Sequence, residues 1–426
     1  MIGAVAGGLF ALLALTVPVG IVLFLLGFGV DLFFSPFPLI RGLGQVIWSS
    51  SNSATLIAIP FFVLLGELLV GGGVAARTYG ALDKWLGWLP GGLVHANIGT
   101  ATMFSATSGS SVATAATVAT VAMPQAEKLG YDPRLFSGAI AAGGTLGILI
   151  PPSINLIVYG FLTETSIPRL FLAGLLPGLL MALAFVVVTA LICLWKPSLG
   201  GQRRRFGWDE RLRSLVHLVP IIALFAVVVG SIYAGWATPT ESAAIGVVMA
   251  LLIALPGGQV TLDMMRRALL GTVRVTSMIM LVIIGAYFLN FTLASAGLGR
   301  DLTALIASFD LTPLGTIGLL VVLYIVLGFF IETLSLMVAT IPITVPIVVG
   351  LGFDPVWFGI LLIVLVEMAL ITPPVGLNLY VVQGARKSGH LGQVMVGAMP
   401  YVLVMLAMVA ALIAVPGIAL YLPSRL

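Results

Sequence analysis

A polar stretch interrupts an otherwise strongly apolar chain at residues 100–120, which read TATMFSATSGSSVATAATVAT. It is built mainly from Ser, Thr, Gly and Ala, it carries no charge, and its centre at 106–111, ATSGSS, is a poor helix interior. Unpaired backbone groups are costly against lipid, so irregular backbone persists in a membrane only inside protein or beside a cavity. The stretch therefore predicts a re-entrant helical hairpin whose tip borders a site, although small residues also favour close helix–helix packing.

The composition of the whole chain is that of an integral membrane protein. Of its 426 residues 60% are hydrophobic and 8% are charged, whereas soluble domains carry roughly 25% charged residues. Apolar runs of about 20 residues, the length that crosses a bilayer, recur along the chain. The run at 3–30 lacks the basic segment and cleavage site of a signal peptide, so we expect it to be the first span. A single cysteine, Cys193, excludes a disulfide framework, and no ATP-binding phosphate loop is present in the sequence.

Two double prolines interrupt later apolar runs, Pro151-Pro152 within GILIPPSIN and Pro373-Pro374 within LITPPVGLN. Each pair removes two backbone donors and disrupts a helix, which leaves carbonyls of the preceding turn without partners. Neighbouring helices can satisfy such a kink. In a transporter, however, the freed carbonyls can bind Na⁺ while half-helix N-termini face an anion. Because each break follows a predicted hairpin, the paired pattern favours a site.

The two halves of the chain match each other at an offset of 222 residues. LGYDPRLF at 129–136 corresponds to LGFDPVWF at 351–358, and the two double prolines correspond as well. The clustered Gly, Asp and Pro identities make coincidence between two apolar stretches a poor explanation. The chain is therefore predicted to contain an internal repeat.

The distribution of basic residues predicts that this repeat is inverted. If the hydrophilic loop at 196–213 is cytoplasmic by the positive-inside rule, counting spans outward from it places 15 of the 19 basic residues on the same side. The N-terminus is then cytoplasmic, the C-terminus lies outside, and the two hairpins enter from opposite faces. An inverted repeat of this kind is a pattern of secondary transporters.

We accordingly predict an all-α polytopic membrane protein with an inverted repeat, two re-entrant helical hairpins and two broken helices. An N-terminal span and interfacial segment (1–53) precede the first repeat (54–195), the cytoplasmic loop (196–213) and the second repeat (214–422). Each repeat holds an amphipathic arm, a hairpin and a broken helix, at 71–88, 92–128 and 133–160 and again at 300–310, 312–350 and 355–383.

Acidic residues inside apolar runs are further candidates for function. Glu332 falls at the predicted tip of the second hairpin, within GFFIETLS, where it could be a cation ligand, a proton carrier or a cap of its own tip. Glu67, Glu241 and Glu367 also lie within or at the ends of apolar runs. Such lone acids are often structural, bonded to a neighbouring helix.

The chain resembles the large membrane subunit of tripartite ATP-independent periplasmic (TRAP) transporters. The resemblance is carried by FSATSGSSVATAATVATVAMPQAEKLGYDPRLFSGAIAAGGTLGILIPPS, by FIETLSLMVATIPITVPIVVGLGFDP and by ITPPVGLN, and it extends over essentially the whole chain. It implies an elevator-type transport domain and Na⁺-coupled uptake of an organic anion, such as a C4-dicarboxylate, a sialic acid or another sugar acid, across the bacterial inner membrane. It also implies two partners, a small membrane subunit and a periplasmic substrate-binding protein, and no nucleic acid.

We expect at least two Na⁺ sites, where each hairpin tip meets the break of its own repeat, with the anion between the tips. Backbone carbonyls and Ser, Thr and Asn oxygens suit this hard cation, and neither tip nor break holds a basic residue. The predicted Na⁺ ligands are Ser105, Thr107, Ser108, Gly109, Ser110, Pro151, Asn155, Gly328, Glu332, Thr333, Thr372, Pro374, Gly376 and Asn378. The residues predicted to bind substrate are Ser111, Thr114, Thr145, Ser153 and Ser335.

Three alternatives stay open. A stand-alone sodium–dicarboxylate carrier, which belongs to the wider ion-transporter superfamily and works without a binding protein, would share the repeat and the hairpins. A polytopic membrane enzyme would need a cluster of catalytic acids, histidines or metal ligands, and the sequence shows none: His95, His217 and His390 lie far apart. A channel fits less well than an occluded carrier, because the polar tips enter from both sides. We therefore expect a transporter without enzymatic activity.

Overall fold

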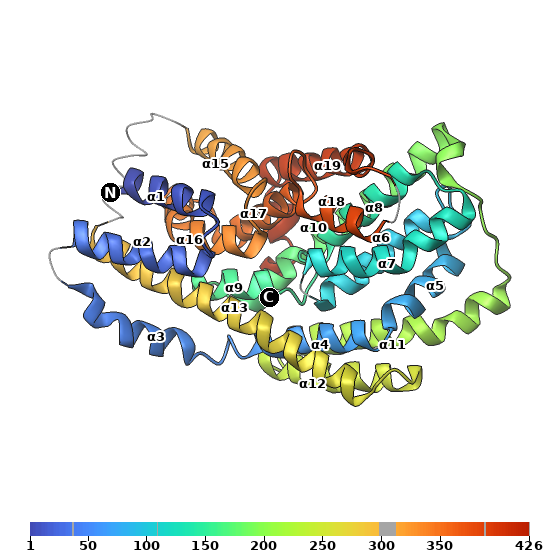
Figure 1. Cartoon of the computed structure of the whole chain (residues 1–426), viewed down its shortest axis with the longest axis horizontal. Helices are drawn as coiled ribbons and strands as arrows, with labels where there is room; N and C mark the ends of the chain where they lie inside the picture. Colours follow the sequence, from blue (N-terminus) through green and yellow to red (C-terminus); the bar gives the residue numbers. More distant parts are fainter. Residues whose placement is uncertain (36–37, 109, 298–311, 387–388, 426) are drawn as a thin grey trace.

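The computed structural model describes residues 1–35, 38–108, 110–297, 312–386 and 389–425, and the regular elements in these ranges are all helical (Figure 1). Six of the described helices are long and apolar enough to cross a membrane, or seven if the bent pair α4 (Ala58–Gly71) and α5 (Val74–Leu86) forms one span. The prediction of an all-α polytopic membrane protein is confirmed.

One group of helices comes from the beginning and the middle of the chain. Within it, α2 packs against α13, and α4 packs against both α12 and α13 (Figure 1). We call this group the framework. Besides α4 and α5 it contains α1 (Ile2–Ala14), α2 (Val19–Phe34), η1 (Leu39–Gly42), α3 (Leu43–Ser51), α11 (Trp208–Tyr233), α12 (Pro239–Ala254), η3 (Leu255–Gly257) and α13 (Leu262–Ser295).

The second group contains both hairpins and both broken helices, and we call it the hairpin domain. Its first half is α6 (Leu93–Ser108), α7 (Ser111–Leu129), α8 (Pro133–Leu146), α9 (Ile154–Leu162), α10 (Ile167–Trp195) and η2 (Pro197–Gly200). Its second half is α15 (Pro313–Gly328), α16 (Thr333–Gly350), α17 (Pro355–Ala369), α18 (Leu377–Ala385), α19 (Leu391–Ala414), α20 (Gly417–Leu420) and η4 (Pro423–Arg425). Hairpin, helix, break and helix thus recur in the same order.

The N-terminal apolar run does not form the single span predicted at 3–30. Helix α1 ends at Ala14, Thr16 adopts a left-handed backbone conformation with φ of 58°, and α2 begins after Pro18. Proline lacks the N–H that a continuous helix needs, and it disfavours helical geometry at the residue before it. The break is therefore a local effect of Pro18, and α1 folds back to contact α2.

Helix α5 occupies the range predicted for the first arm, and it is bent by 68° from α4. Its left-handed N-cap, Gly73 with φ of 65°, lies at the elbow. The second predicted arm, at 300–310, lies outside the described residues.

The same cap begins α8 and α17, the third helix of each half of the hairpin domain. Asp132 accepts hydrogen bonds from the backbone N–H groups of Arg134 and Leu135, at 2.8 and 3.2 Å, and a proline follows it at the first helical position. Asp354, which is 222 residues further on, does the same for Val356 at 2.7 Å. An aspartate N-cap followed by proline is a strong helix start, which explains why these residues match between the halves.

Contacts with α19 show that the two repeats run in opposite directions. Near the start of α19, Gly397 touches α8 so closely that a Cβ atom on Gly138 would overlap its carbonyl group. Near the end of α19, the indole N–H of Trp357 in α17 donates to the carbonyl of Leu412 at 2.8 Å. The first turns of α8 and α17 therefore contact positions about 22 Å apart along α19. This arrangement is the inverted repeat that the sequence predicts.

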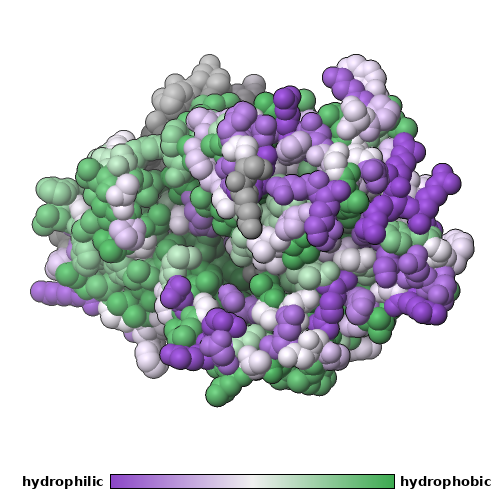
Figure 2. Space-filling view, turned by 45° about the vertical axis from the view of Figure 1, so that its right-hand side comes forward, coloured by the Kyte–Doolittle hydropathy of each residue, from purple (hydrophilic) through white to green (hydrophobic). Residues whose placement is uncertain are grey.

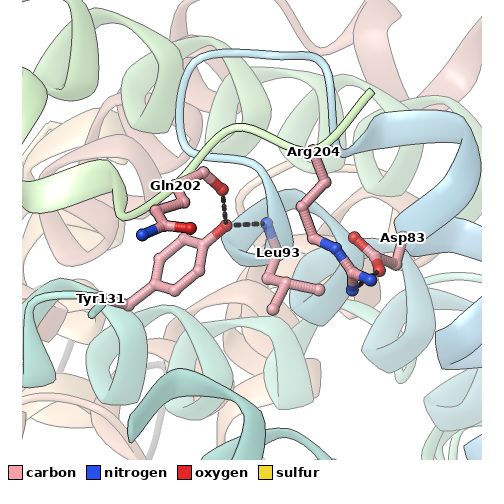
Figure 3. A network of polar contacts seen from close by, with 5 residues as sticks. All are labelled: Asp83, Leu93, Tyr131, Gln202 and Arg204. Carbon is pink, nitrogen blue, oxygen red and sulfur yellow. Dashed lines mark hydrogen bonds and ion pairs between the residues drawn. The ribbon is translucent and has the colours of Figure 1, made fainter. Parts of the chain in front are cut away.

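The segment between η2 and α11 ties the arm to the hairpin domain (Figure 3). Arg204 forms a 2.8 Å ion pair with the largely buried carboxylate of Asp83 on α5. The hydroxyl of Tyr131 accepts a 3.0 Å hydrogen bond from the N–H of Leu93 and donates to the carbonyl of Gln202 at 3.4 Å. The end of α5, the start of α6 and the end of α7 are thus held at the same edge of the molecule.

Candidate functional site

A cavity of about 230 Å³ lies between the hairpin domain and the framework. Both hairpin tips, α9 and the end of α17 form one wall, and α4 and α13 form the other. Its lining residues are Val63, Gly66, Glu67, Val70, Ser110, Ser111, Val112, Ala113, Thr117, Ile148, Ile154, Asn155, Val275, Met278, Ile279, Glu332, Thr333, Leu334 and Leu370. The cavity is smaller than the ~300–1,000 Å³ typical for drug-sized ligands, so its size suits a small molecule.

Three helices begin at this cavity. The first residues of α7, α9 and α16, which are Ser111, Ile154 and Thr333, all line it. Unpaired N–H groups and the helix dipole make each N-terminus an attractive position for negative charge. No Arg or Lys is found among the described lining residues, so the positive potential in the cavity comes from the backbone.

Side-chain caps hold these helix starts. Ser110 accepts a 3.3 Å hydrogen bond from the N–H of Ala113, and Ser153 accepts one from Leu156 at 3.4 Å. Glu332 occupies the same position in the second repeat as Ser110 in the first, and its carboxylate accepts from the N–H of Ser335 at 3.1 Å. Three roles were considered for Glu332, and the structure shows one of them: it caps the helix at its own tip.

The carboxylate of Glu367, which is fully buried in α17, joins the two hairpins. Its Oε2 atom accepts a short hydrogen bond from the hydroxyl of Ser111, and its Oε1 atom accepts one from Thr333 at 3.2 Å. No ion pair to Glu367 is present among the described residues. Burying an unpaired carboxylate is costly, so a proton or a cation is needed to offset this charge.

The second half of each broken helix packs against the hairpin of the other repeat. Helix α9 contacts α16, and α18 contacts α7 and α8. Asn378 in α18 donates to the carbonyl of Ala141 at 3.2 Å, and its amide nitrogen lies beside Gly144, which also lies close to the carbonyl of Ser111. The sequence prediction paired Asn378 with the second tip, whereas these contacts place it beside the first.

Other predicted residues of the first half are distributed as follows. Pro151, Thr114 and Thr145 are buried, and Thr145 donates to the carbonyl of Ala142 and contacts Met405 of α19. Ser105, Thr107 and Ser108 belong to the last turns of α6, where only the backbone is described, and Gly109 lies outside the described residues.

In the second half, Gly328 at the end of α15 packs tightly on Ala369 of α17, which brings the second tip to the second break. Thr372 donates back to the carbonyl of Met368 at 2.7 Å, and Gly376 adopts a left-handed conformation with φ of 59°. Pro374 is exposed beside them.

Sequence reasoning gave too little weight to two acids that the structure brings to this region. Glu67 lines the cavity from α4, where its carboxylate lies against Gly271 of α13. Glu367 corresponds to Thr145 under the offset of 222, so the repeat itself places a carboxylate in α17 where α8 has a hydroxyl. A polar residue stands at the same position of both helices, which are otherwise mainly apolar. This match was the sequence signal that could have identified Glu367.

Comparison with known proteins agrees with the family resemblance noted in the sequence. The family model described as "Tripartite ATP-independent periplasmic transporter, DctM component" matches residues 6–418. The C4-dicarboxylate TRAP transporter large permease protein DctM of Pseudomonas aeruginosa is 34% identical, over 93% of this chain and 92% of its own length. The sialic acid TRAP transporter large permease protein SiaM of Vibrio cholerae is 33% identical, over 89% and 88%. The crystal structure of the Alcanivorax borkumensis YdaH transporter shares the fold, with a TM-score of 0.62, 16% identity and coverage of 93% and 96%.

Proposed function

The chain belongs to the DctM family of tripartite ATP-independent periplasmic transporters, and from this premise we propose that it takes up a small organic anion across the inner membrane. It is a multi-pass large permease subunit rather than an enzyme. Relatives are named for C4-dicarboxylates and for sialic acid, and we propose a carboxylate substrate of this class, a sugar acid included.

The observation that carries this proposal is the convergence of three helix N-termini on one cavity. A carboxylate there accepts hydrogen bonds from backbone N–H groups at the starts of α7, α9 and α16. Because no described lining residue is basic, the site stabilises an anion without a fixed ion pair. Such an anion is also easier to release than one held by a guanidinium group.

We further propose that uptake is coupled to Na⁺. The donor set fits this hard cation: the Oδ1 atom of Asn378 is buried and accepts no hydrogen bond from any described residue, and the carbonyl of Ser111 lies nearby. The buried carboxylate of Glu367 lies behind Ser111 and adds negative charge. Bound Na⁺ would supply the positive charge that the cavity lacks.

An elevator motion would use the division of the molecule into two groups of helices. The cavity lies between the hairpin domain and α4 and α13 of the framework, so a shift of one group against the other would carry the site across the membrane. We propose that the loop at 196–213 lies in the cytoplasm and the C-terminus in the periplasm. Because α1 folds back on α2, with Gly8 beside Leu26, we assign the N-terminus to the periplasmic side, opposite to the side predicted from the sequence. A small membrane subunit and a periplasmic binding protein would complete the tripartite system.

Uptake into proteoliposomes tests this proposal. Vesicles should contain this chain with its small membrane partner, and labelled dicarboxylates and sugar acids should be offered with a matching binding protein. We expect uptake only when the binding protein and an inward Na⁺ gradient are both present. Full uptake by the purified chain alone would instead identify a stand-alone sodium–dicarboxylate carrier, and uptake that ignores the gradient would contradict Na⁺ coupling.

A further inference from the structure

A groove outside the candidate site lies where the arm meets two framework helices. It has a volume of about 520 Å³ and is formed by the start of α5, the first half of α11 and the end of α12. Its walls are mostly apolar, with Val216, Pro220 and Ala223 on one side and Met249 and Leu252 on the other. Val216 and Leu252 are 66% and 59% exposed, so these walls face the lipid.

The base of the groove is cationic. The Nη2 atom of Arg77 donates to the carbonyls of Gly72 and Ile253, at 3.2 and 3.3 Å, which fixes the guanidinium between the ends of α4 and α12. Gly257 lies against the same group, since a Cβ atom there would come 3.1 Å from Nη1, which is closer than ordinary van der Waals contact. Arg77 is therefore held at the groove by two carbonyls and by the contact with Gly257.

The remaining donors of Arg77 have no partner in the described part of the chain. The ion pairs there involve Arg204, Arg213 and Arg267, and no carboxylate lines the groove. His217, also in the groove, adds a second nitrogen-bearing side chain. A positive charge that only carbonyls contact retains the capacity to bind an anion.

The groove lies at the boundary between the charged and the apolar parts of its helices. Helix α11 begins with WDERLRS and becomes mainly apolar from Leu215, while α12 ends at Ala254 and is followed by the turn PGGQ at 256–259. Figure 2, turned to bring the right-hand end of Figure 1 forward, shows hydrophilic residues gathered toward that end. Arg77 therefore lies at headgroup depth, with apolar walls leading away from it.

We propose that this groove binds an anionic membrane lipid, whose headgroup phosphate contacts Arg77 and whose acyl chain lies between the walls of α11 and α12. Charge complementarity selects the headgroup, because a phosphate accepts two hydrogen bonds from the free edge of a guanidinium. The exposed apolar walls select a lipid over a soluble phosphate. Basic pockets between spans on the positively charged side suit lipids of this kind.

Native mass spectrometry of the purified full chain tests this site. The protein is titrated with phosphatidylglycerol or with phosphatidylcholine of the same acyl chains. We expect phosphatidylglycerol to bind about fivefold more tightly, which is the ratio that one basic residue near an anionic surface provides. The variant Arg77→Gln should abolish that preference, Arg77→Lys should retain part of it, and Arg266→Gln, which removes an exposed charge on α13, should retain all of it.

Further measurements distinguish the lipid from other ligands. Glycerol 3-phosphate should not displace the lipid, and Ala223→Phe, which fills the groove but leaves Arg77 in place, should weaken binding of phosphatidylglycerol. Ala223→Phe keeps the test decisive if Arg77→Gln does not fold. Equal preference in wild type and Arg77→Gln would overturn the proposal. Displacement by glycerol 3-phosphate would indicate a soluble anion, and loss of the lipid when the small membrane subunit binds would indicate a protein interface; either result also overturns it.

Discussion

Ser111 and Thr333 occupy equivalent positions in the two repeats and donate hydrogen bonds to opposite oxygens of the same carboxylate, that of Glu367. Each is the first residue of the helix that follows its hairpin tip. One side chain in the second repeat therefore holds both tips, although Ser111 and Glu367 are separated by 256 positions. A movement that takes one tip out of hydrogen-bonding reach of this carboxylate breaks the link between the tips.

Replacing Glu367 should separate its structural role from its charge. Glu367→Ala leaves two buried hydroxyls without an acceptor, at about 1–3 kcal/mol each, and we expect a lower melting temperature. Glu367→Gln keeps the size and one acceptor, so it should fold but require about tenfold more Na⁺ for half-maximal uptake, a change of about 1.4 kcal/mol. The melting temperature is measured on purified protein, and the Na⁺ dependence of uptake on reconstituted protein.

Glu127→Gln is the matched control for these variants. Glu127 is exposed on α7, and its replacement removes a carboxylate without touching the tips. It should leave the melting temperature and the Na⁺ dependence unchanged. Wild-type Na⁺ dependence in Glu367→Gln would show that the carboxylate serves only to hold the tips.

The close contact of α8 with α19 predicts a strict size limit at Gly397. A Cβ atom there would overlap the backbone of Arg134, which no rotamer change can relieve. Gly397→Ala should therefore destabilise the protein by more than the 1–3 kcal/mol typical for overpacking with side chains. Gly318→Ala, where nothing lies within 4 Å, should be neutral or stabilising by up to about 1 kcal/mol. Thermal unfolding of both variants checks this prediction, and equal melting temperatures would contradict the packing.

The inverted repeat also predicts the sidedness of two exposed positions. Helix α19 begins beside α8 and ends beside α17, so the segment after it lies on the side opposite the 196–213 loop. Cysteines placed at Arg203 and Ser424 should react with a membrane-impermeant reagent from opposite sides. The native Cys193 is 1% exposed and should contribute little background. Labelling of both positions from one side would refute the assignment.

The elements with a local chemical cause were predictable from the sequence. A hairpin tip rich in Gly and Ser, the double prolines and the Asp-Pro caps at 132–133 and 354–355 each act through their own backbone, and the structure places breaks or helix starts at all of them. Pro18 is a local signal of the same kind, but its place in an apolar run of spanning length masked it.

The packing of each broken helix against the hairpin of the other repeat could not be predicted in this way. Nothing in the sequence around Asn378 indicates that α18 packs on α7 and α8 instead of on its own hairpin. That choice depends on close packing between segments more than 200 positions apart, such as the approach of Asn378 to Gly144. For the same reason Glu367 resembled a lone structural acid until the tips were placed beside it.

This packing between the repeats leads to a final prediction about Na⁺ coupling. Asn155 and Asn378 follow different breaks: Asn155 lines the cavity with both tips, whereas Asn378 lies beside the first. If their oxygens bind Na⁺, Asn155→Leu and Asn378→Leu should each raise the Na⁺ concentration for half-maximal uptake, and the double variant should lower the cooperativity of the Na⁺ dependence. Thr120→Val, which removes a hydroxyl that donates to Ala116 on the exposed face of α7, should change neither. Uptake is measured against Na⁺ at saturating substrate. An effect on substrate affinity alone, with the Na⁺ dependence unchanged, would show that these amides bind the anion and not the cation.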